Sequence, residues 1–408
     1  MRIGDFADVR GGKRLPNGEP LLDHPTAHPY IRLVDVVDRR INNANVKYLS
    51  PEIHKQISSY IVSGHDVCLA IVGHTIGLVF YVDEKWHGAN LTENAARITN
   101  IKGVDPRYLF YVLSSSYGLE DIKARTVGSA QGKLPLYSIR DIEVLIPSLL
   151  EQRAIAHILG TLDDKIELNR QMNETLEAMA RALFKSWFVD FDPVRAKAED
   201  RDHGRPKPLA DLFPDSFENL EMGEIPKGWE VKPIGDFIER LTVGQKYEQK
   251  TVSPIGKVPV LDQGKSGVIG YHDDAPGVVA SVDAPVVVFA NHTCYMRLIA
   301  FSFSTIQNVL PFIGKGVDTV WAFYATYGKQ SFIEYKGHWP DFVIHKIAVP
   351  DPKLTTEFAR LAHPLLKQIW MRESESRTLA VLRDTLLPKL NSGDLSVKDA
   401  ERFIGRAT

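Results

Sequence analysis

The sequence predicts an α+β protein with two globular domains in a pseudo-twofold arrangement, joined by two long antiparallel coiled-coil helices. The first observation is a repeat, because Ile3-Gly4-Asp5-Phe6 recurs identically at residues 234–237. The second is that Ile146-Pro147 is echoed by Val349-Pro350, after which a constant offset of 203 residues aligns two helical segments without gaps. The third is an apolar heptad in both of these segments. Together they indicate a duplication followed by divergence of one half.

Length and composition fit two domains of an ordinary soluble protein. The chain has 408 residues, 44% of them hydrophobic and 25% charged, and contains no apolar run long enough to span a bilayer. Its formal net charge of −2 argues against nucleic-acid binding by bulk charge alone. The opening residues lack an apolar signal core, and there are only two cysteines, Cys68 and Cys294. We therefore expect a cytoplasmic protein with no membrane role.

The domain boundaries are placed where the pattern of apolar segments and the content of Gly, Asn and Pro change along the chain. Residues 1–147 contain short apolar or alternating strands separated by Gly, Asn and Pro, with a helix expected near residues 106–114. The same pattern of short strands separated by turn-forming residues recurs over residues 229–350. Strands are expected there at residues 258–261, 278–281, 286–290 and 342–349. Residues 193–228 are rich in charge, Pro and Gly, and are predicted to be a linker on the surface.

Residues 148–192 and 351–408 are predicted to be helical. The first seam comprises Ile155, Leu162, Asn169, Leu176 and Leu183, with Ile158, Met172 and Met179 at the next position and Leu159, Ile166 and Trp187 beside it. The second comprises Phe358, Leu365, Arg372, Leu379 and Leu386, flanked by Leu361, Ile369, Leu382 and Leu390. Each seam carries one polar residue, a device that fixes register and partner, so the helices are predicted to pair. The alternative is that each stripe only packs on its own domain.

Both helical segments also contain a residue pair that weakens helical structure. Gly160-Thr161 in the first is matched by His363-Pro364 in the second. Glycine lowers helix stability, and proline removes a backbone donor. We therefore expect each segment to consist of a short helix, a break and then the long helix.

Several motifs are similar to those of one known family. The run LEQRAIAHILGTLDDKIELN at residues 150–169, continued by ALFKSWF at 182–188, and the tail LLPKLNSG at 386–393 resemble the helical regions of type I restriction-modification specificity (S) subunits. The openings at residues 3–6 and 228–237, and the segments NLTENA at 90–95 and QGKSGVIGYH at 263–272, resemble parts of that family's target-recognition domains. The resemblance covers essentially the whole chain.

This resemblance implies the domain roles. Residues 1–147 and 229–350 would be target-recognition domains, each reading one half of a bipartite site in double-stranded DNA. The helices of 148–192 and 351–408 would be spacers that set the gap and bind two methyltransferase (M) subunits and, where the system has one, a motor/nuclease (R) subunit. A helix over residues 163–187 would extend about 37 Å, close to one turn of duplex. The subunit would be non-catalytic, with no cofactor of its own, and S-adenosylmethionine, ATP and Mg would be bound by its partners.

The candidate DNA contacts are polar and basic residues in glycine-rich loops, where the backbone can approach phosphate and side chains can reach bases. In the first domain they are Arg10, Lys13, Arg14, Asn17, His74, Thr75, Ser129, Gln131 and Lys133. In the second they are Gln245, Lys246, Gln263, Lys265, Ser266 and His292. Arginine suits guanine, and glutamine or asparagine suits adenine, but the sequence does not assign a base to any residue. The alternative for each is a solvated loop side chain.

An aromatic cluster follows the first seam and has two interpretations. Phe184, Trp187, Phe188 and Phe191 are more apolar bulk than a two-helix seam requires. They either dock a methyltransferase subunit or pack against the second recognition domain.

Motifs for chemistry are weak. An adenine methyltransferase needs a Gly-rich cofactor turn and an Asn/Asp-Pro-Pro-aromatic loop, and Phe191-Asp192-Pro193-Val194 has one proline and an aliphatic residue instead. Two distant cysteines form no zinc cluster. The rival hypotheses are a self-contained DNA methyltransferase or nuclease with divergent motifs, and a coiled-coil protein scaffold.

Overall fold

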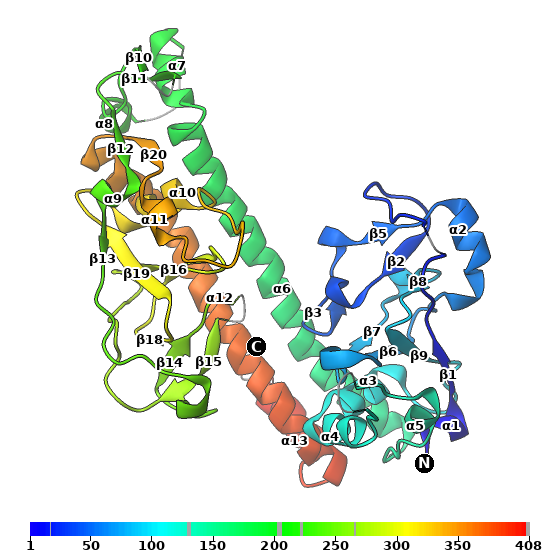
Figure 1. Cartoon of the computed structure of the whole chain (residues 1–408). Helices are drawn as coiled ribbons and strands as arrows, with labels where there is room; N and C mark the ends of the chain where they lie inside the picture. Colours follow the sequence, from blue (N-terminus) through cyan, green and yellow to red (C-terminus); the bar gives the residue numbers. More distant parts are fainter. Residues whose placement is uncertain (17, 129–131, 202–205, 221–222, 265–266, 405–408) are drawn as a thin grey trace. The chain divides into compact units, whose positions relative to one another are not determined.

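The computed structural model describes residues 1–16, 18–128, 132–201, 206–220, 223–264 and 267–404. The chain divides into two compact units. Unit 1 comprises Met1–Leu168 with Glu375–Thr408, and unit 2 comprises Asn169–Ser374. Two long helices, α6 (Leu149–Phe188) and α12 (Pro352–Ser392), each contribute one half to each unit (Figure 1). Among the described residues, no helix is both long and apolar enough to cross a bilayer.

Unit 1 contains two main sheets. The antiparallel sheet has the order β1 (Asp8–Gly11), β9 (Ala95–Thr99), β6 (Val67–Ala70), β7 (Val79–Tyr81). The mixed sheet has the order β5 (Lys47–Tyr48), β2 (Pro29–Ile31), β8 (Asn90–Leu91), in which β2 and β8 are parallel. A small hairpin joins β3 (Val36–Val37) and β4 (Arg40–Ile41). The remaining helices of unit 1 are α1 (Ile3–Phe6), α2 (Pro51–Gln56), α3 (Pro106–Ser114), α4 (Ser116–Ala124), α5 (Leu136–Arg140) and α13 (Val397–Ile404).

Unit 2 repeats this strand order. Its antiparallel sheet runs β13 (Ile238–Arg240), β19 (Val309–Gly314), β16 (Val286–Ala290), β17 (Met296–Ile299). Its mixed sheet runs β15 (Val268–His272), β14 (Val258–Leu261), β18 (Ser304–Thr305), with β14 and β18 parallel. Two further pairs are β12 (Glu230–Pro233) with β20 (Lys346–Val349) and β10 (Phe217–Leu220) with β11 (Gly223–Pro226). The helices are α7 (Asp192–Ala198), α8 (Lys207–Ala210), α9 (Ile234–Phe237), α10 (Thr319–Thr326) and α11 (Trp339–Val343).

The repeated tetrapeptide has the same structural role in both units. Residues Ile3–Phe6 and Ile234–Phe237 each form one helical turn, α1 and α9. Ile3 and Ile234 are fully buried, and the two phenylalanines are nearly so. Each turn therefore inserts an isoleucine and a phenylalanine into the core of its own unit. The repeat of sequence is a repeat of packing, and the predicted duplication is confirmed by the shared strand order.

The two long helices pair in antiparallel fashion, as predicted. In unit 1, Asp163 of α6 binds Arg383 of α12, and Lys165 lies 3.5 Å from Glu375. In unit 2, the Asn173 side-chain amide donates to the Ile369 carbonyl at 3.3 Å. Residue numbers fall along α12 as they rise along α6, so the helices run in opposite directions.

Three details of the helical prediction were wrong. Both helices are continuous through Gly160 and Pro364. A Cβ on Gly160 would lie 3.3 Å from Arg107 Nη1, so the missing side chain lets unit 1 pack closely there. Pro364 lies between the buried residues Ala362 and Leu366, whose burial offsets a helical cost of about 3 kcal/mol.

The third detail concerns the methionines assigned to the first seam. Met172 is 38% exposed and Met179 is 53% exposed. A helix has 3.6 residues per turn, so positions spaced by seven drift off a straight contact face.

Residues 193–228 are more than the predicted surface linker. In the described part of this range, α7, α8 and the β10–β11 hairpin are formed. Val194, Phe213 and Ile225 belong to the hydrophobic core of unit 2. Their irregular spacing produces neither a helical nor a strand period, so their burial could not be predicted from the sequence.

Candidate nucleic-acid interface

A turn between β8 and β9 organises the candidate site of unit 1. The turn consists of Thr92, Glu93 and Asn94. Three backbone hydrogen bonds tie it to other segments: Lys13 N–H donates to the Leu91 carbonyl (2.8 Å), Thr92 N–H to Ile31 (3.0 Å) and Ile71 N–H to Asn94 (2.9 Å). The glycine-rich loop after β1 and the loop after β6 therefore flank the turn.

Gly12 makes this close approach possible. A Cβ at Gly12 would lie 2.0 Å from the Thr92 carbonyl oxygen and 2.5 Å from that of Leu91. Both contacts are with backbone, which cannot move aside as a flexible side chain can. The position thus requires glycine.

Most of the predicted contacts of unit 1 gather around this turn. Lys13 and Arg14 follow Gly12, and the Lys13 ammonium lies 5.6 Å from the centre of the Tyr60 ring. His74 and Thr75 lie in a 3-10 turn whose first residue, Gly73, donates to Gly132 at 2.8 Å. Lys133, next to Gly132, joins the same cluster of loops.

Three other predicted residues of unit 1, Asn17, Ser129 and Gln131, lie outside the described residues. Arg10 projects from β1 and is paired with Asp8 at 2.9 Å.

Arg14 and Glu93 form an ion pair at the surface of the turn. Arg14 Nε donates to Glu93 Oε1 at 2.8 Å, and Thr92 Oγ1 donates to Glu93 Oε2 at 3.1 Å. Burial opposes ionisation of Glu93, but the hydrogen bonds from Arg14, the backbone and Thr92 hold its pKa below the ordinary value. The same hydrogen bond raises the pKa of Arg14. Both groups are therefore charged at neutral pH.

Unit 2 builds the same scaffold with different side chains. Tyr247 N–H donates to Thr305 (3.1 Å), Ile306 N–H to Leu261 (3.1 Å) and Asn291 N–H to Asn308 (2.9 Å). These bonds match those of unit 1 one for one, which makes Tyr247 equivalent to Lys13, Glu248 to Arg14, Gln307 to Glu93 and Asn308 to Asn94. The backbone is repeated while the groups it presents are changed.

An open groove of about 520 Å³ lies at this turn of unit 2. Gln263 and His292 line it, and the Gln263 side-chain oxygen accepts from the His292 backbone N–H at 2.9 Å. The His292 ring is 4.8 Å from that of Tyr335, which is 82% exposed. Gln307 and Asn308 complete this wall of the groove.

The other predicted residues of unit 2 are placed as follows. Gln245 and Lys246 are exposed, and Lys246 pairs with Thr305 just before Tyr247 enters the groove lining. Lys265 and Ser266 lie outside the described residues.

Sequence reasoning missed the turn residues themselves. Glu93, Asn94, Gln307 and Asn308, together with the exposed Tyr335, were not among the candidates. A signal existed, because the family-like segment NLTENA and the segment STIQNV at residues 304–309 share an asparagine at the fifth position. One shared residue in six is too little to align without the structure.

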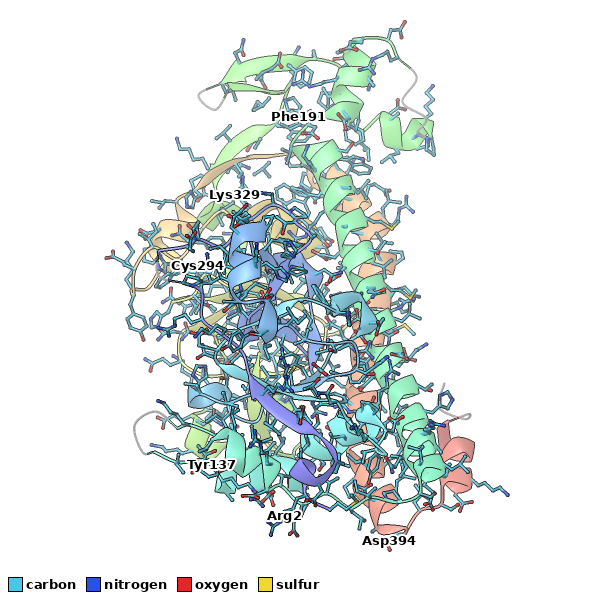
Figure 2. The ribbon with its side chains drawn as sticks, turned by 90° about the vertical axis from the view of Figure 1, so that its right-hand side faces the viewer. Arg2, Tyr137, Phe191, Cys294, Lys329 and Asp394 are labelled. Carbon is cyan, nitrogen blue, oxygen red and sulfur yellow. The ribbon has the colours of Figure 1, made fainter. Side chains whose placement is uncertain are left out.

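Two residues of the aromatic cluster, Trp187 and Phe188, are buried within unit 2. Trp187 is 1% exposed and Phe188 8% exposed, and Phe184 and Phe191 pack against the same core of unit 2. The Phe188 ring lies 5.5 Å from that of Phe358, and the Phe191 ring lies 5.5 Å from that of Trp229. Phe191 is just beyond the end of α6 (Figure 2). The assignment of Trp187 and Phe188 to partner binding is therefore corrected to packing within unit 2, and partner binding by the half-buried Phe184 and Phe191 stays a prediction.

Within the described ranges, no group of three His, Cys, Asp or Glu side chains could hold a metal ion.

Comparison with known proteins finds one family model and several relatives similar to this chain. Residues 1–178 match the family model described as type I restriction modification DNA specificity domain. The MjaIX specificity subunit of Methanocaldococcus jannaschii is 25% identical over 321 residues, which cover 73% of this chain and 71% of the relative. The HindI specificity subunit of Haemophilus influenzae is 34% identical over 218 residues, which cover 43% and 44%.

The fold agrees with these relatives. A type I restriction-modification S subunit from M. genitalium has a crystal structure that matches with a TM-score of 0.52 at 14% identity, over 96% of this chain and 95% of that one. This chain therefore shares its fold, two units with a repeated strand order and two long antiparallel helices, with that subunit. More narrowly, residues 1–178 match the type I restriction modification DNA specificity domain, and the relatives to which the chain is similar are type I restriction enzyme specificity subunits.

Proposed function

We propose that this chain is the DNA sequence-specificity subunit of a type I restriction-modification complex. Each unit's recognition domain reads one half of a bipartite site, and the paired helices set the gap and bind two methyltransferase subunits. The observation that carries the proposal is the matched pair of turns, 92–94 and 306–308, held by equivalent backbone hydrogen bonds but bearing different side chains. One scaffold with exchanged side chains is what reading two different half-sites requires.

The groups at these turns suit contact with duplex DNA. Lys13, Lys133 and Lys246 lie in or beside the loops and are able to bind phosphate. Gln263, Gln307 and the Arg14–Glu93 pair offer the donors and acceptors that distinguish bases in the major groove. The net charge of only −2 implies that partner subunits supply part of the attraction for the DNA backbone.

The chemistry belongs to the partners in this proposal. The chain itself is non-catalytic and cytoplasmic, and S-adenosylmethionine, ATP and Mg are bound by the methyltransferase subunits and by a motor/nuclease subunit where one exists. A self-contained enzyme would bind S-adenosylmethionine or a metal ion as the isolated chain. A protein-only scaffold would retain no DNA sequence selectively.

The test is selection from a random duplex library by the chain co-expressed with its neighbouring methyltransferase, at several salt concentrations. The proposal predicts two short enriched blocks about one helical turn apart. A single block would show that one recognition domain is idle, and no enrichment at all would favour the scaffold. Methylation or cleavage by the isolated chain would establish the enzyme alternative.

A further inference from the structure

We propose that Arg14 reads a guanine in the half-site bound by unit 1, and that Glu93 holds its guanidinium in the reading orientation. This inference rests on the proposed function and adds a base and a pair of residues to it. Arg14 is the specificity-determining residue of the pair, and Glu93 is a positioning residue.

The ion pair leaves the Nη1 and Nη2 edge of the Arg14 guanidinium accessible to a base. Its Nε donates to Glu93 at 2.8 Å, and the side chain is 76% exposed. A guanidinium has five N–H donors in a fixed plane, so a bond through Nε leaves the Nη1 and Nη2 edge directed away from the carboxylate. Among the described residues, Glu93 is the sole hydrogen-bond partner of this guanidinium.

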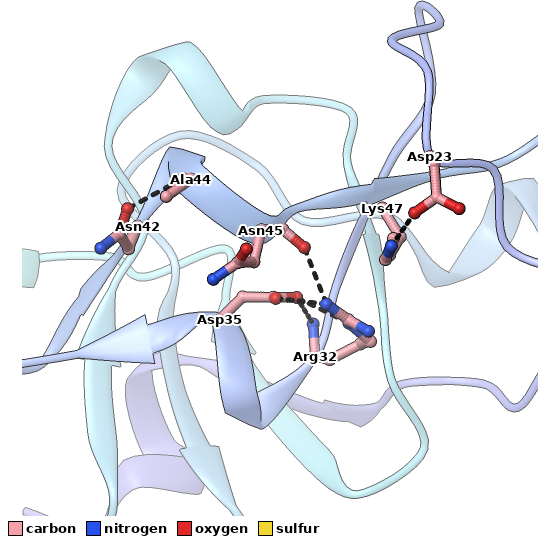
Figure 3. A network of polar contacts seen from close by, with 7 residues as sticks. All are labelled: Asp23, Arg32, Asp35, Asn42, Ala44, Asn45 and Lys47. Carbon is pink, nitrogen blue, oxygen red and sulfur yellow. Dashed lines mark hydrogen bonds and ion pairs between the residues drawn. The ribbon is translucent and has the colours of Figure 1, made fainter. Parts of the chain in front are cut away.

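Arg32, which directly follows β2 in unit 1, shows the opposite arrangement (Figure 3). Its Nε donates to Asp35 Oδ2 at 3.0 Å and its Nη2 donates to Asp35 Oδ1 at 2.7 Å. The same Nη2 also donates to the Asn45 carbonyl at 2.8 Å. The Asp35 side chain is fully buried. Arg32 therefore stabilises the fold of its loop, whereas Arg14 is held at one edge and open at the other.

Glu93 would be unfavourable at a DNA surface without this role. A free carboxylate repels phosphate, but here Arg14 neutralises it and the second oxygen is engaged by Thr92. Guanine presents two adjacent acceptors, N7 and O6, in the major groove, and two parallel N–H groups of an arginine match them. Holding the guanidinium in place beforehand reduces the side-chain entropy lost on binding.

Comparison of the equivalent positions in the two units predicts a guanine in one half-site only. The residues of unit 2 equivalent to Arg14 and Glu93 are Glu248 and Gln307, so the pair is not repeated. A guanine read in this way should appear in the block bound by unit 1 and have no counterpart at the matching position of the other block.

The experiment is library selection by the methyltransferase complex carrying Arg14→Lys, Glu93→Gln or neither. Lysine keeps the charge but lacks the planar fork, so preference for guanine at one position of one block should fall roughly tenfold or more. Glu93→Gln should weaken preference at the same position by a smaller factor. The matched control is Arg201→Lys, which lies outside the two long helices and the two turns. Its Nε donates to Glu199 at 2.5 Å with 61% of the side chain exposed, and the substitution should leave both blocks unchanged.

A second measurement has an arm that uses the wild-type complex alone, so this arm does not depend on a variant folding. Replacing the guanine of the selected site by 7-deazaguanine removes the N7 acceptor, and the wild-type complex should lose affinity at that base alone. The Arg14→Lys complex should lose no further affinity when the same guanine is replaced by 7-deazaguanine. The inference fails if the unit 1 block has no such guanine, or if Arg14→Lys weakens all sequences equally. If the wild-type complex selects two blocks and the Arg14→Lys complex selects the same two blocks unchanged, this inference alone is overturned. If the wild-type complex selects no blocks, the proposed function is overturned.

Discussion

The Arg383–Asp163 ion pair should hold α12 against α6 in unit 1. Arg383 Nη1 and Asp163 Oδ1 are 2.5 Å apart, and each side chain is 12% exposed. Tyr111 also donates to Asp163 Oδ2 at 2.8 Å. In Arg383→Met the Asp163 carboxylate would stay buried and would keep the hydrogen bond from the Tyr111 hydroxyl but lose its cation, at a cost of about 3 to 5 kcal/mol for a fully buried pair. Partial exposure favours the lower end, about 3 kcal/mol.

The assay is native-state hydrogen exchange of the α6 segment that belongs to unit 1. A loss of about 3 kcal/mol corresponds to exchange faster by roughly 100-fold. Asp163→Asn and the double variant complete a thermodynamic cycle, in which the double variant should be more stable than the sum of the single effects predicts. Lys165→Gln is the control, because its pair with Glu375 is about one-third exposed and should be worth under about 1 kcal/mol. Additivity of Arg383→Met and Asp163→Asn within about 0.5 kcal/mol would refute the reasoning.

Three further predictions follow from packing and burial. Gly12→Ala places a Cβ against the Thr92 carbonyl and should lower stability by about 1 to 3 kcal/mol, seen as an earlier melting transition; unchanged melting would show that the backbone contact is not required. Phe188→Ala should cost about 3 to 5 kcal/mol in urea unfolding, because the ring packs on Phe358, and wild-type stability with lost methyltransferase binding would restore the docking hypothesis. Burial raises the pKa of Tyr108 from 10.0 to about 12, so the neutral phenol stabilises the fold below about pH 10 and this contribution is lost as the pH rises toward 12. The free energy of unfolding should therefore fall over that range by up to about 3 kcal/mol, and should do so less in Tyr108→Phe; equal slopes for the two proteins would contradict this.

The sequence predicted the duplication and the helix pair because both are written in local patterns. The tetrapeptide at residues 3–6 and 234–237 is identical because each copy must fill the same corner of a core with an isoleucine and a phenylalanine. The heptads of α6 and α12 are visible in the sequence because seam residues such as Leu162 and Leu379 in unit 1, and Phe358 and Ile369 in unit 2, are buried in the core of their unit. The predicted breaks failed because tertiary burial around Gly160 and Pro364 outweighs their low helix propensity.

The candidate site was only partly predictable. Loop composition identified Lys13, Arg14 and His292, since glycine-rich loops with polar side chains are local features. The turn that organises them joins Lys13 to Leu91 and Ile71 to Asn94 through backbone bonds, which leave no trace in side-chain identity. For this reason the equivalence of Glu93 with Gln307 emerged from hydrogen-bond register and not from alignment.

The most direct test of the central claim is to assign each enriched block to one unit. Library selection would be run on the wild-type complex, on Arg14→Lys in unit 1 and on Gln307→Ala in unit 2, where Gln307 is an exposed residue of the groove. If each unit reads one half of a bipartite site, Arg14→Lys should degrade one block and Gln307→Ala the other, with the spacing between blocks unchanged. Loss of preference in the same block, or in both blocks, from either substitution would contradict two independent readers on one scaffold.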